Sequence, residues 1–268
     1  MMTILTYFLI TVFGLIIGSF LSALTYRLPR GISILKGRSF CPKCKNKISW
    51  YDNIPVFSFY FLGGKCRTCK AQISLRYPLI EFFTLLVFLF ISISFGSCSS
   101  HITGSAICQW RNFMGFWALP YLLVIATGFL AIFVIDLEKQ IIPDNIVFSL
   151  FGLSILLLIL INPEFTYVNI LTAFGGASFL LLINLFTKGK GMGLGDVKLA
   201  LLGGIVLGWP GTLTWIFLSF ITGAIVGLIL IFFKKAEFGK HIPFGPFLVF
   251  SYFVSLVFGN CFFQIFIP

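Results

Sequence analysis

The stretch GMGLGDVKLALLGGIVLGWPGTLTWIFLSFITGAIVGLILIFF, residues 191–233, decides the fold class, because Asp196 and Lys198 are its only charged residues. A membrane-spanning helix needs roughly 20 mostly apolar residues, and this stretch is long enough for almost two. Its middle holds Gly-Trp-Pro-Gly at 208–211, a run of turn-forming residues. We therefore expect two membrane helices here, 197–213 and 214–233, joined by a turn.

Similar apolar runs recur along the chain. Six further candidates for membrane helices are residues 4–25, 78–95, 118–135, 146–162, 167–187 and 244–267. The chain of 268 residues is 59% hydrophobic and 10% charged, whereas a soluble domain carries roughly 25% charged residues. The sequence therefore predicts an all-α polytopic membrane protein with about eight transmembrane helices.

The positive charges are confined to short stretches between these runs. The first of them, Arg27, follows the first apolar run, which therefore lacks the basic start of a cleavable signal peptide and places the N-terminus outside. Eight crossings then put 18 of the 19 Lys and Arg residues in the cytoplasm, with only Arg111 outside. This segregation explains the net charge of +11 by membrane insertion and argues against nucleic-acid binding. The predicted domains are a first helix (1–26), a cytoplasmic module (27–77) and a seven-helix membrane core (78–268).

The cytoplasmic module carries four of the cysteines. Cys41-Pro-Lys-Cys44 and Cys66-Arg-Thr-Cys69 are two C-x-x-C pairs with 21 residues between them. Four thiolates in two such pairs suit tetrahedral Zn²⁺, and a module this small has too little core to fold without a staple. The alternative is a disulfide framework, which the reducing side of the membrane disfavours. The sequence therefore predicts a structural zinc site.

Two more cysteines, Cys98 and Cys108, fall in the predicted external loop 96–117. An oxidising exterior permits a disulfide between them. Their spacing leaves open whether they pair.

Only eight residues are acidic, and Glu81, Asp136, Asp144 and Asp196 lie beside predicted helix ends. A carboxylate at a bilayer boundary is costly and is a functional candidate by default. Structural alternatives exist: Asp144 could favour a helix N-terminus, and Asp136 could end a helix with Lys139 as its partner.

Asp136 and Asp196 gain weight as a pair, because both are expected at cytoplasmic helix ends. Two close carboxyl groups cannot both ionise and so share a proton. One then activates water while its protonated partner polarises a scissile carbonyl, which favours an aspartic protease. Gly193 and Gly195 would let a substrate backbone approach Asp196. The alternative for these glycines is a flexible loop followed by close helix packing.

The motifs resemble those of the prepilin peptidases, also called type IV leader peptidases. GMGLGDVK and IDLEKQIIPD are similar to the family's two aspartate motifs, GSFLSALTYRLP (18–29) to its opening motif, residues 41–81 to its cysteine module and IPFGPFL (242–248) to its closing motif. The likeness covers nearly the whole chain. Ser22 stands where the family usually has Asn.

The resemblance implies an aspartic endopeptidase of the bacterial inner membrane, with Asp136 and Asp196 as catalytic residues facing the cytoplasm. Its substrates would be prepilins or pseudopilins with a short basic leader ending in Gly, followed by a hydrophobic stem helix. A second implied activity is N-methylation of the new N-terminal residue. S-adenosylmethionine, the methyl donor, thus joins Zn²⁺ among the expected cofactors.

Supporting roles in the site are assigned to Gly193, Gly195, Lys198, Asp144 and Glu81. Of these, Glu81 is a candidate contact for the basic leader. Membrane lipids are an expected partner as well, because the basic cytoplasmic surface attracts anionic headgroups.

Two other classes of function compete. A proton- or ion-coupled transporter would use Asp136 and Asp196 to carry ions, but such carboxylates usually lie near the bilayer midplane on broken helices. An assembly protein that docks a partner through its cysteine module would leave the paired aspartates without a role. The sequence favours the protease.

Overall fold

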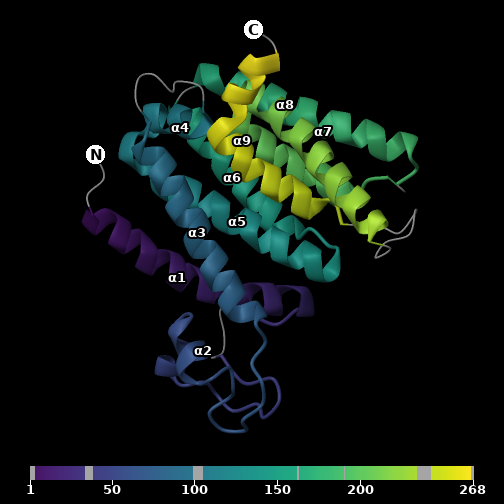
Figure 1. The fold of residues 1–268 in the computed structure, drawn as a ribbon. Helices are drawn as coiled ribbons and strands as arrows, with labels where there is room; N and C mark the ends of the chain where they lie inside the picture. Colours follow the sequence, from purple (N-terminus) through teal and green to yellow (C-terminus); the bar gives the residue numbers. More distant parts are fainter. Residues whose placement is uncertain are drawn as a thin grey trace. The chain divides into compact units, whose positions relative to one another are not determined.

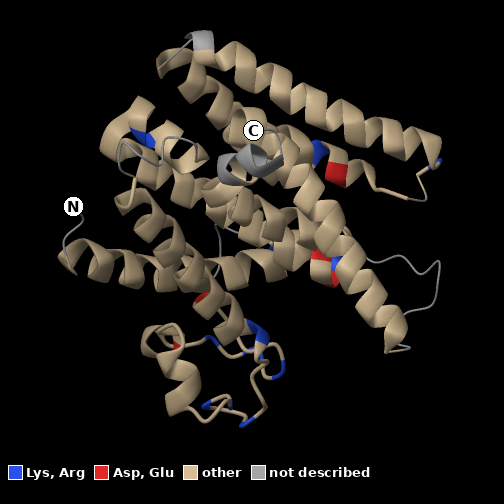
Figure 2. Cartoon of the chain, turned by 45° about the horizontal axis from the view of Figure 1, so that its top comes forward, with Lys and Arg blue, Asp and Glu red and all other residues tan. Residues whose placement is uncertain are grey.

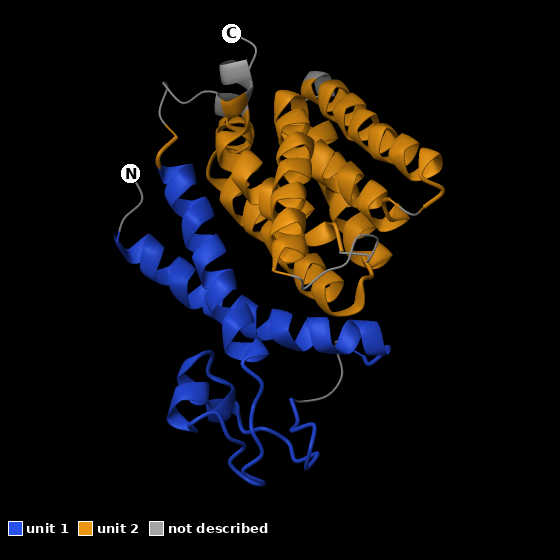
Figure 3. Cartoon of the chain, turned by 45° about the vertical axis from the view of Figure 1, so that its right-hand side comes forward, with its two compact units in different colours: residues 1–96 blue, residues 97–268 orange. Residues whose placement is uncertain are grey.

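The computed structural model describes residues 4–33, 39–98, 105–161, 163–189, 191–233 and 243–266. Within these ranges the chain forms helices and two isolated β-bridges but no strand, which confirms the predicted all-α class. The chain divides into two compact units, residues 1–96 (unit 1) and 97–268 (unit 2), coloured separately in Figure 3.

Unit 1 is a pair of long helices with the cysteine module between them in sequence (Figure 1). Its elements are α1 (Ile4–Arg27), η1 (Leu28–Arg30), η2 (Trp50–Asn53), α2 (Phe57–Phe61) and α3 (Arg76–Gly96). Helices α1 and α3 approach closely because α1 presents glycine at the contact. A Cβ atom on Gly18 would lie only 2.6 Å from the Cα of Glu81, and one on Gly14 would lie 3.2 Å from the Cα of Leu85.

Unit 2 is built from helices throughout its described part. They are α4 (Ala106–Met114), η3 (Gly115–Trp117), α5 (Ala118–Lys139), α6 (Asp144–Ile161), α7 (Pro163–Phe186), α8 (Leu194–Phe232) and α9 (Gly245–Phe266). Large aromatic side chains join α5, α8 and α9: the rings of Phe129 and Tyr252 stack with centroids 3.7 Å apart. The indole nitrogen of Trp215 donates to the Leu248 carbonyl (2.7 Å).

Helix α8 is broken at the predicted turn. Gly208 has a left-handed backbone (φ 60°), and neither it nor Trp209 has helical angles. A side chain on Gly203 would overlap the Trp215 ring, although 12 residues of straight helix would separate the two by roughly 18 Å. The two halves of α8 therefore turn back on each other at Gly208–Trp209, as the Gly-Trp-Pro-Gly run predicted.

The number of candidate membrane spans differs slightly from the predicted count of about eight helices. Six stretches of the described chain are long and apolar enough to cross a membrane, and α9 adds a shorter apolar stretch, Gly245–Gly259. The difference arises because the two predicted helices 197–213 and 214–233 are the two halves of α8, counted as one stretch, and because the counted part of α9 is short. The predicted external loop also contains a nine-residue helix, α4, which the sequence reading missed.

Charged residues lie at helix ends and in the loops of unit 1, while the middles of the long helices carry almost none (Figure 2). This distribution is the one that a bilayer imposes, because an unpaired charge in hydrocarbon is costly. The carboxylates that do occur near the helices therefore need an explanation.

Candidate functional site

Asp136 and Asp196 lie within range of each other's charge in unit 2, although 60 residues separate them in sequence. Asp136 lies in the last turn of α5 and Asp196 in the first turn of α8. Both side chains are buried, with 5% and 7% of their surfaces exposed. The two carboxylates are close enough for their charges to repel each other. The structure thus brings together the two residues that the sequence predicted as a catalytic pair.

Side-chain contacts hold residues 191–193, just before α8. The backbone N–H of Gly193 donates to Oδ2 of Asp196 (3.2 Å), so Asp196 caps its own helix. The amide nitrogen of Asn184 donates to the Met192 carbonyl, and the Gly191 N–H donates to the Thr187 hydroxyl (3.2 Å). These contacts fix the direction in which the Asp196 carboxylate points.

Asp136 is held against the start of α9. The backbone N–H of Gly245 lies beside its carboxylate, and a Cβ atom on Gly245 would overlap Oδ2. Within the described chain, this buried Oδ2 makes no hydrogen bond. A buried carboxylate oxygen without a partner is free to take a shared proton or to meet a water molecule or a substrate.

The sequence reading gave Gly245 no role. The feature of the sequence that could have indicated a role for Gly245 is the IPFGPFL motif, in which this glycine begins an apolar helix. Asn184 was missed as well, although a lone Asn within the apolar run LLINLF marks a side chain that needs a partner.

The segment between α5 and α6 packs against the start of α8. A Cβ on Gly195 would lie 3.1 Å from Ile142, which leaves no room for a side chain. Lys198 donates to both carboxylate oxygens of Asp144 at 2.8 Å. Asp144 begins α6, so the expected helix start holds for it, whereas its pairing with Lys198 was not foreseen.

The four module cysteines gather in unit 1. Their Sγ atoms all lie within 4.8 Å of one another, and those of Cys41 and Cys69 are 3.9 Å apart. None of the four is in a disulfide. Tetrahedral Zn²⁺ with Zn–S bonds of about 2.3 Å needs sulfurs about 3.8 Å apart. The cluster therefore fits a zinc ion.

The two C-x-x-C pairs have the same backbone design. Cys41 N–H donates to Asn46 O and Lys45 N–H to Cys41 O (2.9 and 2.8 Å). The second pair repeats this with Cys66 N–H to Ala71 O and Lys70 N–H to Cys66 O (2.8 and 2.9 Å). The backbone N–H groups of Cys69 and Thr68 donate to the Cys66 sulfur and lower the pKa of its thiol to about 7.

Cys98 and Cys108 form a disulfide in unit 2, which answers the question that their spacing left open. The bond links Cys98, which follows the end of α3, to Cys108, which lies in α4. Arg111 supports the same corner by donating to the Cys98 carbonyl (2.9 Å).

Glu81 is a buried residue of α3, with 8% of its surface exposed. Its Oε2 accepts the backbone N–H of Val56 (2.7 Å), so it ties the cysteine module to the α1–α3 pair. Its carboxylate also lies within hydrogen-bonding reach of the Ser19 hydroxyl.

Two family models match the chain. Residues 12–95 match the Bacterial Peptidase A24 N-terminal domain, and residues 123–228 match the Type IV leader peptidase family. No solved structure matches.

Curated relatives match along nearly the whole chain. A protein of Stutzerimonas stutzeri is 32% identical over 93% of this chain and 89% of its own length. One of Pseudomonas aeruginosa is 31% identical over 92% and 88%, and one of Vibrio cholerae is 31% identical over 91% and 93%. All three are named prepilin leader peptidase/N-methyltransferase.

The apolar helices and these relatives make the chain an integral membrane protein of the peptidase class. It belongs to the type IV leader peptidase family. The resemblance drawn from the sequence motifs is therefore confirmed, and neither the helices nor the relatives favour a transporter.

Proposed function

We propose that this chain is a membrane aspartic endopeptidase that removes the leader from prepilin or pseudopilin substrates and N-methylates the new N-terminal residue. The observation that carries the proposal is the pair of buried, neighbouring carboxylates of Asp136 and Asp196. They stand in a chain that is similar, over nine tenths of its length, to proteins named for both activities.

Asp136 and Asp196 would cleave the leader by sharing one proton. The ionised carboxylate takes a proton from water as it attacks the scissile carbonyl, and the protonated one donates to the carbonyl oxygen. Gly245 and Gly193 support this arrangement, since each holds its backbone N–H beside one carboxylate. Gly195 keeps Ile142 close, so both aspartate motifs stay together.

The orientation rests on the charges. With the N-terminus outside, the basic module, Asp136 and Asp196 all face the cytoplasm of a bacterial inner membrane. The reversal of α8 at Gly208–Trp209 supports this, because it returns the chain to the side from which α8 began. The lysine-rich segment 234–240, whose structure lies outside the described residues, then also falls on the cytoplasmic side. A short basic leader is presented on that side, where the module's own basic surface attracts anionic lipid headgroups.

Cys41, Cys44, Cys66 and Cys69 would hold the zinc ion. Four thiolates would satisfy a structural zinc ion without an open position for a substrate, so the ion would serve to stabilise the module. S-adenosylmethionine would supply the methyl group for the second activity.

The test is mass spectrometry of a prepilin incubated with the purified full-length protein, with and without S-adenosylmethionine. We expect the leader to be lost in both samples and one methyl group to be gained only with the donor. A substrate that stays intact would refute the peptidase. A cleaved product that stays unmethylated in excess donor would refute the methyltransferase.

A further inference from the structure

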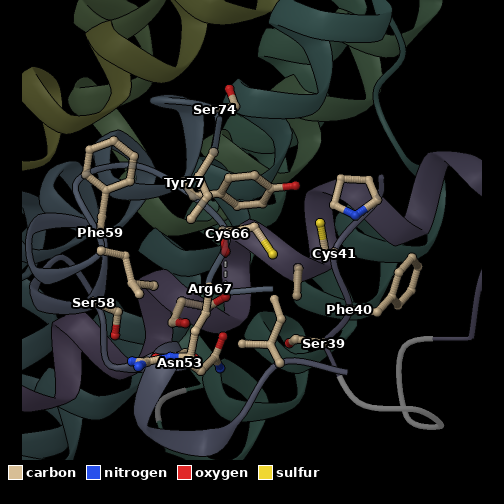
Figure 4. Close-up of a pocket in the computed structure, with 18 of the residues that line it drawn as sticks. Ser39, Phe40, Cys41, Asn53, Ser58, Phe59, Cys66, Arg67, Ser74 and Tyr77 are labelled. Carbon is tan, nitrogen blue, oxygen red and sulfur yellow. Dashed lines mark hydrogen bonds and ion pairs between the residues drawn. The ribbon is translucent and has the colours of Figure 1, made fainter. Parts of the chain in front are cut away.

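Unit 1 contains a cavity of ≈ 370 Å³ that the peptidase proposal does not use. It lies between the cysteine module and the ends of α1 and α3, and all of its lining residues come from unit 1. In Figure 4 the Tyr77 ring and the sulfurs of Cys41 and Cys66 are drawn within this pocket. A largely apolar pocket of about 300–1,000 Å³ with a few converging polar groups is the usual form of a small-molecule site.

A buried carboxylate lies at one side of this cavity. Glu81 lines it, and two donors hold the carboxylate in place: the Val56 backbone N–H at 2.7 Å and the nearby Ser19 hydroxyl. Neither donor carries a positive charge. These partners orient the negative charge of Glu81 without neutralising it, and the cations that also line the cavity, Arg27, Lys43, Lys47 and Arg67, are not among them.

The turn at residues 55–57, whose Val56 N–H binds Glu81, is strained. The Phe57 N–H donates to the Pro55 carbonyl (2.6 Å), and Val56 between them has φ 62° and ψ −50°. This three-residue turn is rare, and a β-branched residue is poorly suited to it. Such strain costs about 1–3 kcal/mol and is found mostly at binding and active sites.

We propose that the cavity binds the methyl donor, a sulfonium nucleoside, with Glu81 facing its positive charge. This rests on the methyltransferase activity proposed above. A sulfonium cation is attracted by a carboxylate and by aromatic faces, and Tyr26, Tyr77 and Phe40 line the same cavity. The two family matches agree with a separate place for the second activity. The match described as a leader peptidase covers residues 123–228, and the residues of the cavity lie within the other match, at 12–95.

Methyl transfer in this cavity needs no further reactant. The neutral amino nitrogen of the cleaved substrate attacks the methyl carbon of the donor, forming the N–C bond. The S–C bond breaks, and its electron pair stays on sulfur as a neutral thioether. The extra proton on nitrogen passes to solvent.

The decisive measurement compares binding of S-adenosylmethionine and S-adenosylhomocysteine, whose sulfur is neutral, to the zinc-loaded full-length protein by calorimetry. Glu81→Gln keeps an acceptor for the Val56 N–H but removes the charge. We expect it to weaken S-adenosylmethionine about tenfold and S-adenosylhomocysteine less than about twofold. Glu138→Gln, the same change in unit 2, should alter neither. Unchanged binding of S-adenosylmethionine to a folded Glu81→Gln protein would overturn the proposal.

A second variant guards against misfolding of the first. Ala23→Leu narrows the cavity while Glu81 itself is retained, so it should weaken both ligands equally. Photolabelling with radioactive S-adenosylmethionine should mark peptides from residues 1–96. If the wild-type protein methylates its product but the label maps to residues 97–268, the location alone is refuted. If no methylation occurs, the activity is refuted.

Anionic phospholipid vesicles test the other occupant of the cavity. If they displace the label and calorimetry detects no binding of the donor, the cavity binds lipid headgroups and the proposal is overturned.

Discussion

The cysteine module and the aspartate site are assembled in opposite ways. All four cysteines come from one short segment, residues 41–69, and the two pairs repeat the same backbone hydrogen bonds. The aspartate site draws Asp136, Asp196 and Gly245 from three helices of unit 2. The module therefore depends on local turns and, as we propose, on a bound metal, whereas the aspartate site depends on helix packing. Changes in one region should leave the chemistry of the other largely intact.

The largest expected effect is at the aspartates. Asp136→Asn and Asp196→Asn keep the shape of the side chain but cannot exchange a proton, so each should lower the cleavage rate by about 10³-fold or more. Zinc content and donor binding in unit 1 should not change. The measurement is leader release from a prepilin in single-turnover assays, with metal analysis of the same samples.

Asp144→Asn is the matched control, because it removes a carboxylate from the start of α6, the helix that follows the one carrying Asp136. We expect a partial loss only, since Asp144 is exposed and pairs with Lys198. If Asp144→Asn were inactive while Asp136→Asn cleaved normally, the wrong aspartate of DLEKQIIPD would have been assigned. In the wild type, the rate should fall at low pH, where both carboxyl groups are protonated, and at high pH, where both are ionised.

The second prediction concerns a change in the cysteine module. Cys66→Ser should release the zinc and cost the module several kcal/mol, because metal binding supplies much of its folding free energy. Cleavage should fall far less than in the aspartate variants. Elemental analysis and limited proteolysis measure the two consequences. Thr68→Ala, which keeps the backbone N–H beside the Cys66 sulfur, should retain the metal. Wild-type protein purified under reducing conditions without any zinc would contradict the assignment.

This contrast also explains what the sequence could predict. The C-x-x-C spacing is a local pattern, so the sequence could predict that Cys41, Cys44, Cys66 and Cys69 gather in one place. Apolar run lengths gave the helices, and Gly208–Trp209 gave the reversal of α8. Contacts between distant segments left no local pattern: nothing around Gly245 indicates that its N–H lies beside Asp136, and nothing around Val56 indicates a bond to Glu81. The apolar runs also hid α4, because its nine residues are amphipathic and too short to span a bilayer.

Gly245→Ala tests how closely the aspartate site is packed. A methyl group there would overlap Oδ2 of Asp136, so the carboxylate must shift and cleavage should fall by about 10–100-fold. Gly227→Ala is the control, since a Cβ at that helical position meets nothing within 4 Å. It should be neutral, or stabilising by up to about 1 kcal/mol, because alanine is the better helix former. Equal activities of the two variants would show that Gly245 does not position Asp136.

The smallest effect concerns the ion pair that joins the two aspartate motifs. Lys198 and Asp144 are 36% and 53% exposed, so their 2.8 Å contact is largely screened by solvent. Exposed pairs contribute about 0.2–1 kcal/mol, which corresponds to a loss of up to roughly fivefold in cleavage for Lys198→Met if the pair positions the α8 start. The loss should shrink in high salt, where the wild-type pair is screened as well. A double-mutant cycle with Asp144→Asn isolates the contact: the double variant should be no slower than the slower single variant. Fully additive losses would mean that Lys198 acts elsewhere, for instance directly on Asp196, and that the two motifs are held together by Gly195 and Ile142 alone.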